Sequence, residues 1–326
     1  MHRWKMAAIA ALACCLIIGC KNDAPTTVPD NKPTKQVSIP PFQRDSAFSY
    51  VVKQVNFGPR NLGSEGHEAT RQWIVDKLKA CGLEVIEQNF PAQIANAGTY
   101  EATNIIAKYN PGVAERVLMA AHWDTRYIAE KDTDIEDRDD PILGADDGAS
   151  GVAVLLEIAR VVSENPLDLG IDFVFFDAED QGTNGGSTDS WCLGSQYWSR
   201  NLPAGQRPTY GILLDMVGAK GATFPKEGIS MHYAPDIVAK VWQLGQSMGY
   251  GHYFVNTRAT PITDDHQFVN DLTGIPMIDI INYPNGSFGH YHHTSDDDMD
   301  VIDRNTLRAV GQVVLALLYK ESVGAI

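Results

Sequence analysis

From residue 42 onward, the chain alternates segments whose apolar residues recur at helical spacing with short runs that are apolar almost throughout. In one helical segment, Trp73, Ile74 and Leu78 share a face, and Gly82 follows as a stop signal. Short, continuous apolar runs are typical of strands buried on both faces. This alternation predicts an α/β fold. The predicted helices are residues 45–54, 65–81, 150–162, 236–249 and 305–319, and the predicted strands are residues 83–90, 102–109, 116–121, 171–176, 211–214 and 276–281.

The N-terminus follows neither pattern. Basic His2, Arg3 and Lys5 precede an apolar run at 6–19, which is shorter than the about 20 residues that a membrane-spanning helix needs. The segment therefore predicts an export signal. Its last residues read Ile-Ile-Gly-Cys and resemble a bacterial lipobox, with cleavage before Cys20 and attachment of lipid to it. An ordinary secretory signal with a chance cysteine is the alternative.

The residues between this signal and the folded part are polar and dotted with prolines, so we expect a tether there. The predicted organisation is a lipoprotein signal peptide at 1–19, a lipidated Cys20 with a flexible tether at 20–41, and one catalytic domain at 42–326. The protein would be exported and held by its lipid on the bacterial cell envelope, on the periplasmic side or at the outer membrane.

Composition narrows the class of partner. The 326 residues are 44% hydrophobic and 21% charged, which excludes a disordered chain and a bundle of membrane spans. Lysine and arginine number 26 against 41 acidic residues, and the net charge of -15 argues against nucleic acid as a partner. Of the five cysteines, only Cys81 and Cys192 fall in the predicted domain, and the sequence leaves open whether they pair.

Polar residues gather at the ends of the predicted buried strands, the edge at which open α/β sheets bind ligands. Taken singly, each acidic residue there is more often a helix cap or a turn residue. Converging carboxylates, however, would repel one another unless a cation neutralised them. Histidine and carboxylate ligands without cysteine suit Zn²⁺ in an open catalytic site. The residues are His122, Asp124, Asp147, Glu179, Asp180 and Asp215.

Further segments refine this hypothesis. The glycines of the string GADDGASG let the backbone turn tightly around a liganding Asp147. Glu179 and Asp180 are neighbours on an extended segment, so one side chain can bind metal while the other serves as a general base. The stretch 289–294 holds three histidines, of which at least one should be a ligand. The stretch 130–140 has seven carboxylates among eleven residues but lacks the ligand spacing of a calcium-binding hand, so we expect a solvated loop near the site.

These motifs, in this order, resemble the zinc-dependent exopeptidase superfamily, which includes di-zinc aminopeptidases and animal-type glutaminyl cyclases. The resemblance runs from about residue 42 to the C-terminus. It implies an aminopeptidase-like α/β fold, a single domain with a mixed, mostly parallel central sheet flanked by helices. It also implies that Asp147, Asp180 and His293 hold the metal and that Glu179 is the acid/base residue.

Within the superfamily, four strings resemble the zinc-dependent glutaminyl cyclases, including the lipoprotein-anchored cyclases of bacteria such as the Bacteroidetes. This likeness implies that Asp215 and Asp264 complete an acidic hydrogen-bond network with Glu179. Two positions depart from the animal enzymes. Asp180 stands where they have Glu, which keeps the charge, and His292 stands where they have Trp, in the wall of the pocket. The strings are FVFFDAED (173–180), DSWCLGSQYW (189–198), LLDMVGAKGATF (213–224) and TDDHQFV (263–269).

The implied reaction converts an N-terminal glutamine of a peptide or protein to pyroglutamate, with release of ammonia. One Zn²⁺ per chain would polarise the γ-carbonyl, and Glu179 would move the proton from the attacking amine to the leaving nitrogen. Two alternatives are carried forward. A di-zinc aminopeptidase would bind two zinc ions, and a non-catalytic binding lipoprotein would have kept the fold alone. The ligands of the di-zinc alternative are His122, Asp147, Asp180, Asp215 and His293.

Overall fold

The structure, a computed structural model, describes residues 37–95 and 97–326. The predicted signal peptide and Cys20 lie outside these residues. Cys81 and Cys192, whose pairing the sequence left open, are both free thiols. Among the described residues, no helix is both long and apolar enough to cross a membrane.

The packed part of the chain begins before residue 42, where the catalytic domain was predicted to start. Val37 and Ile39 are partly buried and pack against the hydrophobic core, and Phe42 is a buried residue of that core. The backbone N–H of Phe42 donates to Oε1 of Gln312 at 2.9 Å, which ties this segment to the last helix, α8 (Arg304–Glu321). The last residues of the predicted tether therefore pack on the domain.

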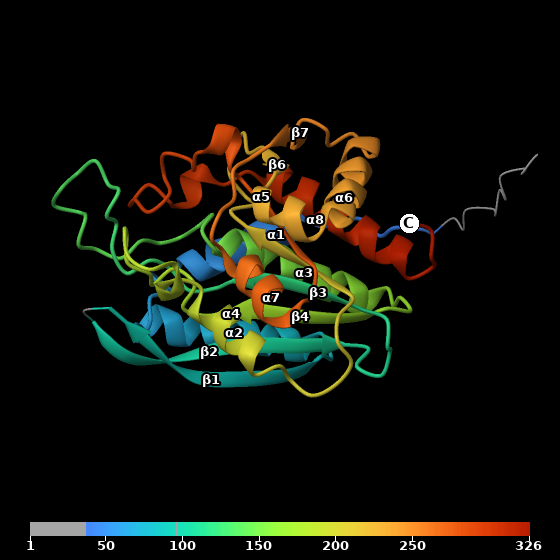
Figure 1. Ribbon diagram of the computed structural model, residues 1–326, viewed down its shortest axis with the longest axis horizontal. Coiled ribbons are helices and arrows are strands. Elements are labelled where there is room, and N and C mark those ends of the chain that lie inside the picture. The colour runs from blue at the N-terminus through green and yellow to red at the C-terminus, as the bar shows by residue number, and fades with distance from the viewer. Residues whose placement is uncertain (1–36, 96) are drawn as a thin grey trace, which may run out of the picture. The chain divides into compact units, whose positions relative to one another are not determined.

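A central sheet of six strands forms the framework (Figure 1). Its strands are β1 (Glu84–Ile94), β2 (Gly98–Tyr109), β3 (Arg116–His122), β4 (Gly170–Phe176), β5 (Tyr210–Asp215) and β8 (Met277–Ile281). They lie in the order β1-β2-β4-β3-β5-β8. Strands β4, β3, β5 and β8 are parallel, whereas β2 is antiparallel to both β1 and β4. The predicted mixed, mostly parallel sheet is confirmed.

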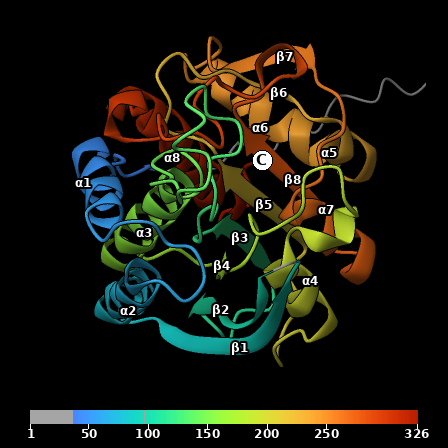
Figure 2. The ribbon, with the colours of Figure 1, turned by 90° about the vertical axis from the view of Figure 1, so that its left-hand side faces the viewer.

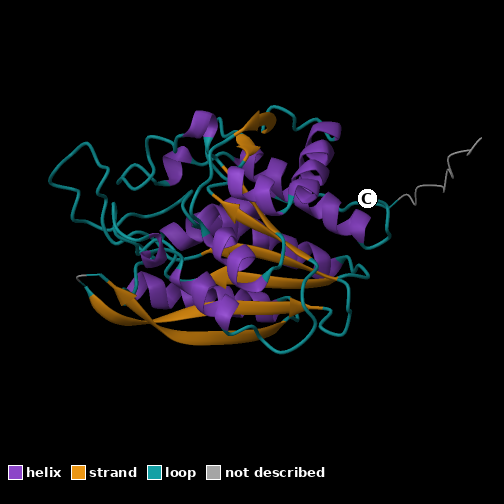
Figure 3. Ribbon diagram, viewed as in Figure 1, coloured by secondary structure: helices purple, strands orange, loops and turns teal. Residues whose placement is uncertain are grey.

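Helices cover both faces of this sheet (Figures 2 and 3). One face carries α8 together with α1 (Arg44–Val55), α2 (Glu65–Ala80) and α3 (Ala149–Glu164), and the other carries α4 (Leu193–Arg200) and α7 (Asp265–Thr273). Beyond β8 lie α5 (Gly228–Tyr233), α6 (Pro235–Ser247) and a second sheet made of β6 (Phe224–Lys226) and β7 (Phe254–Arg258). Single 3₁₀ turns occur at Thr188–Ser190, Pro284–Gly286 and Met299–Val301.

Strand β3 is apolar at every central position because both of its faces are buried. Val117 and Met119 point into the larger core, which contains residues of α3 and α8. Leu118 and Ala120 point into a smaller core that includes residues of α4 and α7. Because successive side chains of a strand alternate between the two faces, and both faces are covered, the run must be apolar throughout.

Helix α3 packs directly on the sheet through a glycine. A Cβ atom at Gly151 would lie 2.1 Å from the carbonyl oxygen of Leu214, so only glycine permits this approach. The helix begins one residue before Ser150, the predicted first residue. The hydroxyl of Ser150 donates to the carbonyl of Asp146 at 2.6 Å and accepts the N–H of Val217 at 2.9 Å. Ser150 therefore joins two loops at the carboxyl edge of the sheet.

The sequence pattern does not predict α4, α5, α7, β6 or β7. Helix α7 illustrates the reason, because its nine residues DHQFVNDLT contain few apolar positions. Its start is set by a cap instead of by periodicity. Asp264 is the N-cap, and its Oδ1 accepts the N–H of Asp265 at 2.5 Å.

Candidate active site

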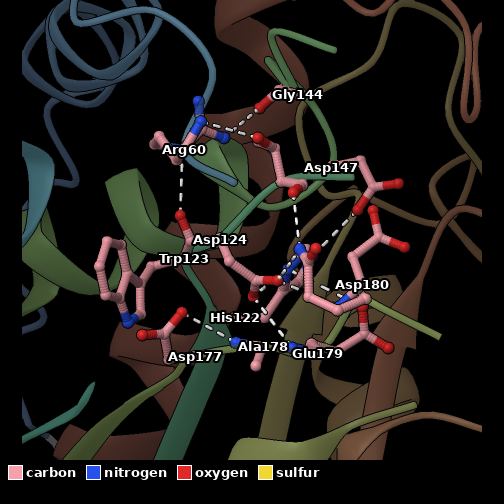
Figure 4. Close-up of polar contacts among 12 residues, drawn as sticks. Arg60, His122, Trp123, Asp124, Gly144, Asp147, Asp177, Ala178, Glu179 and Asp180 are labelled. Carbon is pink, nitrogen blue, oxygen red and sulfur yellow. Dashed lines mark hydrogen bonds and ion pairs between the residues drawn. The ribbon is translucent and has the colours of Figure 1, made fainter. Parts of the chain in front are cut away.

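The polar residues predicted to meet do so at the carboxyl ends of the central strands (Figure 4). His122 ends β3, Glu179 and Asp180 follow β4, and Asp215 ends β5. Asp147 comes from the loop that precedes α3. Residues as many as 93 positions apart in the chain thus meet at one edge of the sheet, as the open α/β geometry requires.

His122 is buried between two of the carboxylates. Its Nε2 lies 3.0 Å from Oδ1 of Asp147 and 3.1 Å from Oδ1 of Asp215. Gly148 permits this packing, because a Cβ atom there would lie 2.6 Å from Nε2 of His122. Burial raises the pKa of Asp215 to about 8, although His122 opposes the shift.

Asp124 fixes the backbone that carries the acidic pair. Its Oδ1 accepts the N–H of Glu179 and its Oδ2 accepts the N–H of Asp180, each at 3.1 Å (Figure 4). The amide of Gln181 donates to Oδ2 at 2.9 Å. Burial raises the pKa of Asp124, but His122 and these donors outweigh it and hold the pKa below its usual value. Asp124 is therefore a buried anion that orients its neighbours.

Hydrogen bonds with Asp177 and Arg60 fix the turn after β4 and the loop before α3. The carboxylate of Asp177 accepts the N–H of Ala178 at 2.8 Å, and Ala178 adopts a φ of 54°. The guanidinium of Arg60 donates to the carbonyls of Trp123 at 3.0 Å and Gly144 at 2.7 Å (Figure 4). This buried arginine joins the loop after β3 to the loop before α3, and so sets the spacing of the site.

Glu179 and Asp180 contact different partners. Oδ1 of Asp180 lies 3.0 Å from Nε2 of His293, whereas Oε1 of Glu179 accepts a hydrogen bond from Sγ of Cys192 at 3.2 Å. Burial raises the pKa of Glu179 well above its usual range, and the charges of Asp180 and Asp264 add to the shift. Glu179 therefore keeps a proton to a higher pH than an ordinary glutamate does.

The two adjacent histidines present different nitrogens to the acidic group. Nδ1 of His293 donates to Oε1 of Glu130 at 2.9 Å, which leaves the Nε2 lone pair directed at Asp180. Nδ1 of His292 lies 2.6 Å from Nζ of Lys131. Because an ammonium group only donates, Nδ1 of His292 accepts and the ring proton sits on Nε2. These contacts favour His293 over His292 as a metal ligand, although a nitrogen of His292 also lies within 4.8 Å of ligand atoms of Asp147 and His293.

A pocket of about 240 Å³ opens onto these groups. His292 forms part of its wall, at the position that departs from the animal cyclases, and stacks on Phe288 with ring centroids 4.0 Å apart. Trp191 lies parallel to the ring of His293, with centroids 6.0 Å apart. The pocket therefore combines flat apolar surfaces with a cluster of carboxylates. Its acidic lining residues are Asp147, Glu179, Asp180, Asp215 and Asp264.

The structure brings Asp264 and Asp215 to the site in different ways. An oxygen of Asp264, an oxygen of Glu179 and Sγ of Cys192 all lie within 4.8 Å of one another. Asp215 pairs with His122 instead, whose Nδ1 lies 3.9 Å from Oε2 of Glu179. The predicted acidic network thus has Asp264 beside Glu179, with His122 between Glu179 and Asp215.

The donor atoms fit a zinc ion. Oδ2 of Asp180 is buried and has no hydrogen-bond partner among the described residues. Oδ2 of Asp147 lies 3.9 Å from Nε2 of His293. An orphaned carboxylate oxygen beside a second carboxylate and a free imidazole lone pair is what a bound Zn²⁺ would satisfy. A second group, formed by His122, Asp147 and Asp215, also has ligand atoms within 4.8 Å of one another.

Two positioning residues escaped the sequence analysis. The carboxylate of Asp297 accepts the N–H of Asp147 at 3.1 Å, which orients the loop before α3. Glu130 begins the acidic stretch predicted to be a solvated loop, yet it hydrogen-bonds His293. Farther along that stretch Ile135 is 76% exposed, so the prediction holds for its tip. The sequence shows acidic residues near the histidines but not which of them makes the contact.

Comparison with known proteins assigns the family. The family model described as "Peptidase family M28" matches residues 104–318. The chain belongs to peptidase family M28. The matched range contains every candidate ligand and acid/base residue described above, so the family match and the site geometry concern the same part of the chain.

Relatives within this family include enzymes named as cyclases. The chain is 27% identical to glutaminyl-peptide cyclotransferase of Bos taurus over 295 residues, which covers 78% of this chain and 76% of the relative. A crystal structure of Bacteroides thetaiotaomicron glutaminyl cyclase bound to N-acetylhistamine is 47% identical with a TM-score of 0.84, covering 86% of this chain and 99% of that one. A leucine aminopeptidase precursor from the same organism is 48% identical with a TM-score of 0.84, covering 87% and 99%.

Proposed function

We propose that this M28 protein is a glutaminyl-peptide cyclotransferase that converts N-terminal glutamine of peptides and proteins to pyroglutamate. The observation that carries the proposal is the pocket, in which a partly buried, protonatable Glu179 lies next to the metal-suited pair of Asp180 and His293. The likeness to a bacterial glutaminyl cyclase over nearly the whole of that enzyme supports the same reaction.

Asp147, Asp180 and His293 would hold the zinc ion, one per chain. When bound, Zn²⁺ supplies Lewis-acid polarisation of the γ-carbonyl of the substrate glutamine. The hydrogen bond from His293 to Glu130 fixes the ring so that Nε2 would be the ligand atom. His292 keeps its proton on Nε2 and serves as a wall of the pocket.

Glu179 moves the proton in this mechanism. The α-amine of the substrate attacks the carbonyl carbon of its own side-chain amide (Cδ), and Glu179 accepts a proton from that nitrogen. It then donates the proton to the amide nitrogen, whose bond to that carbonyl carbon breaks and which leaves as ammonia. The atoms balance without water. Because burial raises its pKa, Glu179 is better suited than an ordinary glutamate both to accept this proton and to return it.

The proposal is tested by mass spectrometry of a Gln-X-X peptide incubated with the purified domain, with and without a metal chelator. A product lighter by one ammonia, which the chelator abolishes, is the expected result. A peptide that stays unchanged with metal-loaded protein would overturn the proposal and favour a non-catalytic binding lipoprotein.

A di-zinc aminopeptidase is the second candidate, favoured by the group of His122, Asp147 and Asp215 that lies beside the first. An enzyme of that kind would release free glutamine and a peptide shortened by one residue. Metal analysis would then give two zinc ions per chain. The same incubation therefore separates the two reactions.

We further propose that the protein is exported and anchored to the bacterial cell envelope through lipid on Cys20. The basic start, the short apolar run and the lipobox-like sequence before Cys20 support this localisation. Its substrates would then be exported peptides and proteins with N-terminal glutamine. Metabolic labelling with a fatty-acid analogue tests the anchor, because a Cys20→Ser variant should lose the label.

A further inference from the structure

A second set of buried titratable side chains lies next to Asp264 but outside the pocket. Asp264 lines the pocket, whereas Asp279 and His266 do not. Oxygens of Asp264 and Asp279 and a ring nitrogen of His266 all lie within 4.8 Å of one another. The resemblance to glutaminyl cyclases implies a place for Asp264 in the acidic network with Glu179, but Asp279 and His266 have no role in the mechanism proposed above.

Asp279 is an unusual residue for its position. It lies in the middle of β8 between apolar residues and is fully buried. Neither oxygen of its carboxylate has a hydrogen-bond donor among the described residues, and Oδ2 of Asp264 also lacks one. A buried carboxylate without donors is strongly disfavoured as an anion, so something must satisfy these oxygens.

A single shared proton satisfies Oδ2 of Asp264 and one oxygen of Asp279. Two facing carboxylates in a buried space cannot both ionise, because their charges repel at short range. Burial raises the pKa of Asp279 well above its usual value, and the nearby charge of Asp264 raises it further. Asp264, Asp215 and Glu227 act on Asp279 in the same direction, so Asp279 is the member of the pair that carries the proton.

His266 and Glu227 close the arrangement on the far side. Oε2 of Glu227 lies 3.0 Å from Nε2 of His266 and also accepts the N–H of Ser230 at 2.7 Å, while Oε1 accepts the N–H groups of Ile229 and Ile262. These N–H donors indicate that Glu227 is ionised. Because an ionised carboxylate can only accept, Nε2 of His266 carries the proton of their hydrogen bond. Nδ1 of His266 has no partner among the described residues and is left free to accept.

We propose that Asp279 is a positioning residue for the cyclisation, which shares its proton with Asp264 and so fixes the Asp264 carboxylate at the pocket. Oδ1 of Asp264 is held by the N–H of Asp265, and the shared proton holds Oδ2. Asp264 then has one orientation toward Glu179 and the substrate amide. The inference rests on the proposed function, since the role of Asp264 belongs to that reaction.

The first test separates hydrogen bonding from packing by two substitutions. Asp279→Asn keeps a donor for Asp264, whereas Asp279→Leu keeps similar volume without one. We expect Asp279→Asn to retain kcat within about 3-fold and Asp279→Leu to lower kcat by about 10- to 100-fold, with KM nearly unchanged in both, as for a loss of orientation. Ile278→Val, on the opposite face of β8, is the packing control and should leave kcat unchanged.

Zinc content accompanies these measurements and should stay the same in all three variants. Equal activity of Asp279→Leu and wild type would overturn the proposal, and so would equal damage by Asp279→Asn and Asp279→Leu, since a donor would then be irrelevant. A metal content that falls in the Asp279 variants would show that Asp264, His266 and Asp279 hold a cation instead of a proton.

Infrared difference spectroscopy of Asp279→Asn against wild type tests the shared proton without using the reaction or the Leu variant. The C=O band of a protonated carboxylic acid should be present at neutral pH and absent in the variant. If Asp279 is ionised, the difference spectrum will show loss of a carboxylate band, which refutes the proposal. This result is independent of whether the protein cyclises glutamine, so the two failures can be told apart.

Discussion

Glu130 provides a quantitative test of how the site holds its metal. Its Oε1 lies 2.9 Å from Nδ1 of His293, and its Oε2 lies 3.1 Å from Nε of Arg126. Burial raises the pKa of Glu130, but His293 and Arg126 outweigh it and hold the pKa at about 2. The acceptor is therefore a full negative charge at any pH at which the enzyme would work.

Replacing Glu130 by Gln keeps an acceptor of the same shape but removes the charge. A hydrogen bond to a charged group contributes about 1 to 2 kcal/mol more than one between neutral groups. Since 1.4 kcal/mol corresponds to a factor of ten, the Kd for zinc should rise about 5- to 30-fold. This expected rise in Kd overlaps the about 10- to 100-fold loss of metal affinity that is typical when a residue orienting a metal ligand is replaced.

The assay is a zinc titration in competition with a chromogenic chelator. Glu136→Gln is the matched control, because Glu136 is exposed on the same acidic stretch and loses the same charge. Its Kd should equal that of the wild type. If Glu130→Gln binds zinc as tightly as the wild type, His293 is not oriented by Glu130. Equal weakening by both substitutions would mean that the overall negative field, and not the hydrogen bond, sets the affinity.

Three more outcomes are expected. Glu179→Gln should keep zinc and lose about 10²- to 10⁴-fold in kcat, because base chemistry is removed while the ligands stay; zinc loss there would mean that Glu179 is a ligand. Asp147→Ala and His293→Ala should lower zinc content, whereas His292→Ala should not, and the reverse order would refute the tautomer argument. Burial raises the pKa of Glu227, but His266 and backbone N–H groups outweigh it and lower the pKa to about 2. Ionised Glu227 therefore stabilises the folded protein at pH values above about 4.3, the pKa of a glutamate in the unfolded chain. In urea unfolding, the advantage of wild type over Glu227→Gln should shrink as pH falls from about 4.3 towards 2, and a constant gap would refute the linkage.

The framework and the strand-end residues could be predicted from the sequence because buried parallel strands leave a distinct signal. The run that precedes His122 is apolar at each central position, and the first polar residue marks the functional edge. Asp264 shows where that reasoning fails, since it caps a helix with few apolar positions and was reached through resemblance alone. The role of Glu130 could not be predicted for another reason. The composition of residues 130–140 is typical of a solvated loop, and only the folded structure shows that Glu130 contacts His293.

Two kinds of buried acid lie at the carboxyl edge of the sheet and next to it, and their hydrogen-bond donors distinguish them. Asp124, Asp177 and Asp297 each accept backbone N–H groups at both oxygens, so these carboxyl groups fix the path of the chain. Asp180 and Asp279 have oxygens with no donor among the described residues. Oxygens left in that state must be completed by something that the backbone does not provide. For Asp180, the neighbouring lone pair of His293 favours a metal ion; for Asp279, the facing carboxyl of Asp264 favours a proton. The pattern of missing donors therefore points to chemistry more directly than the number of acidic residues does.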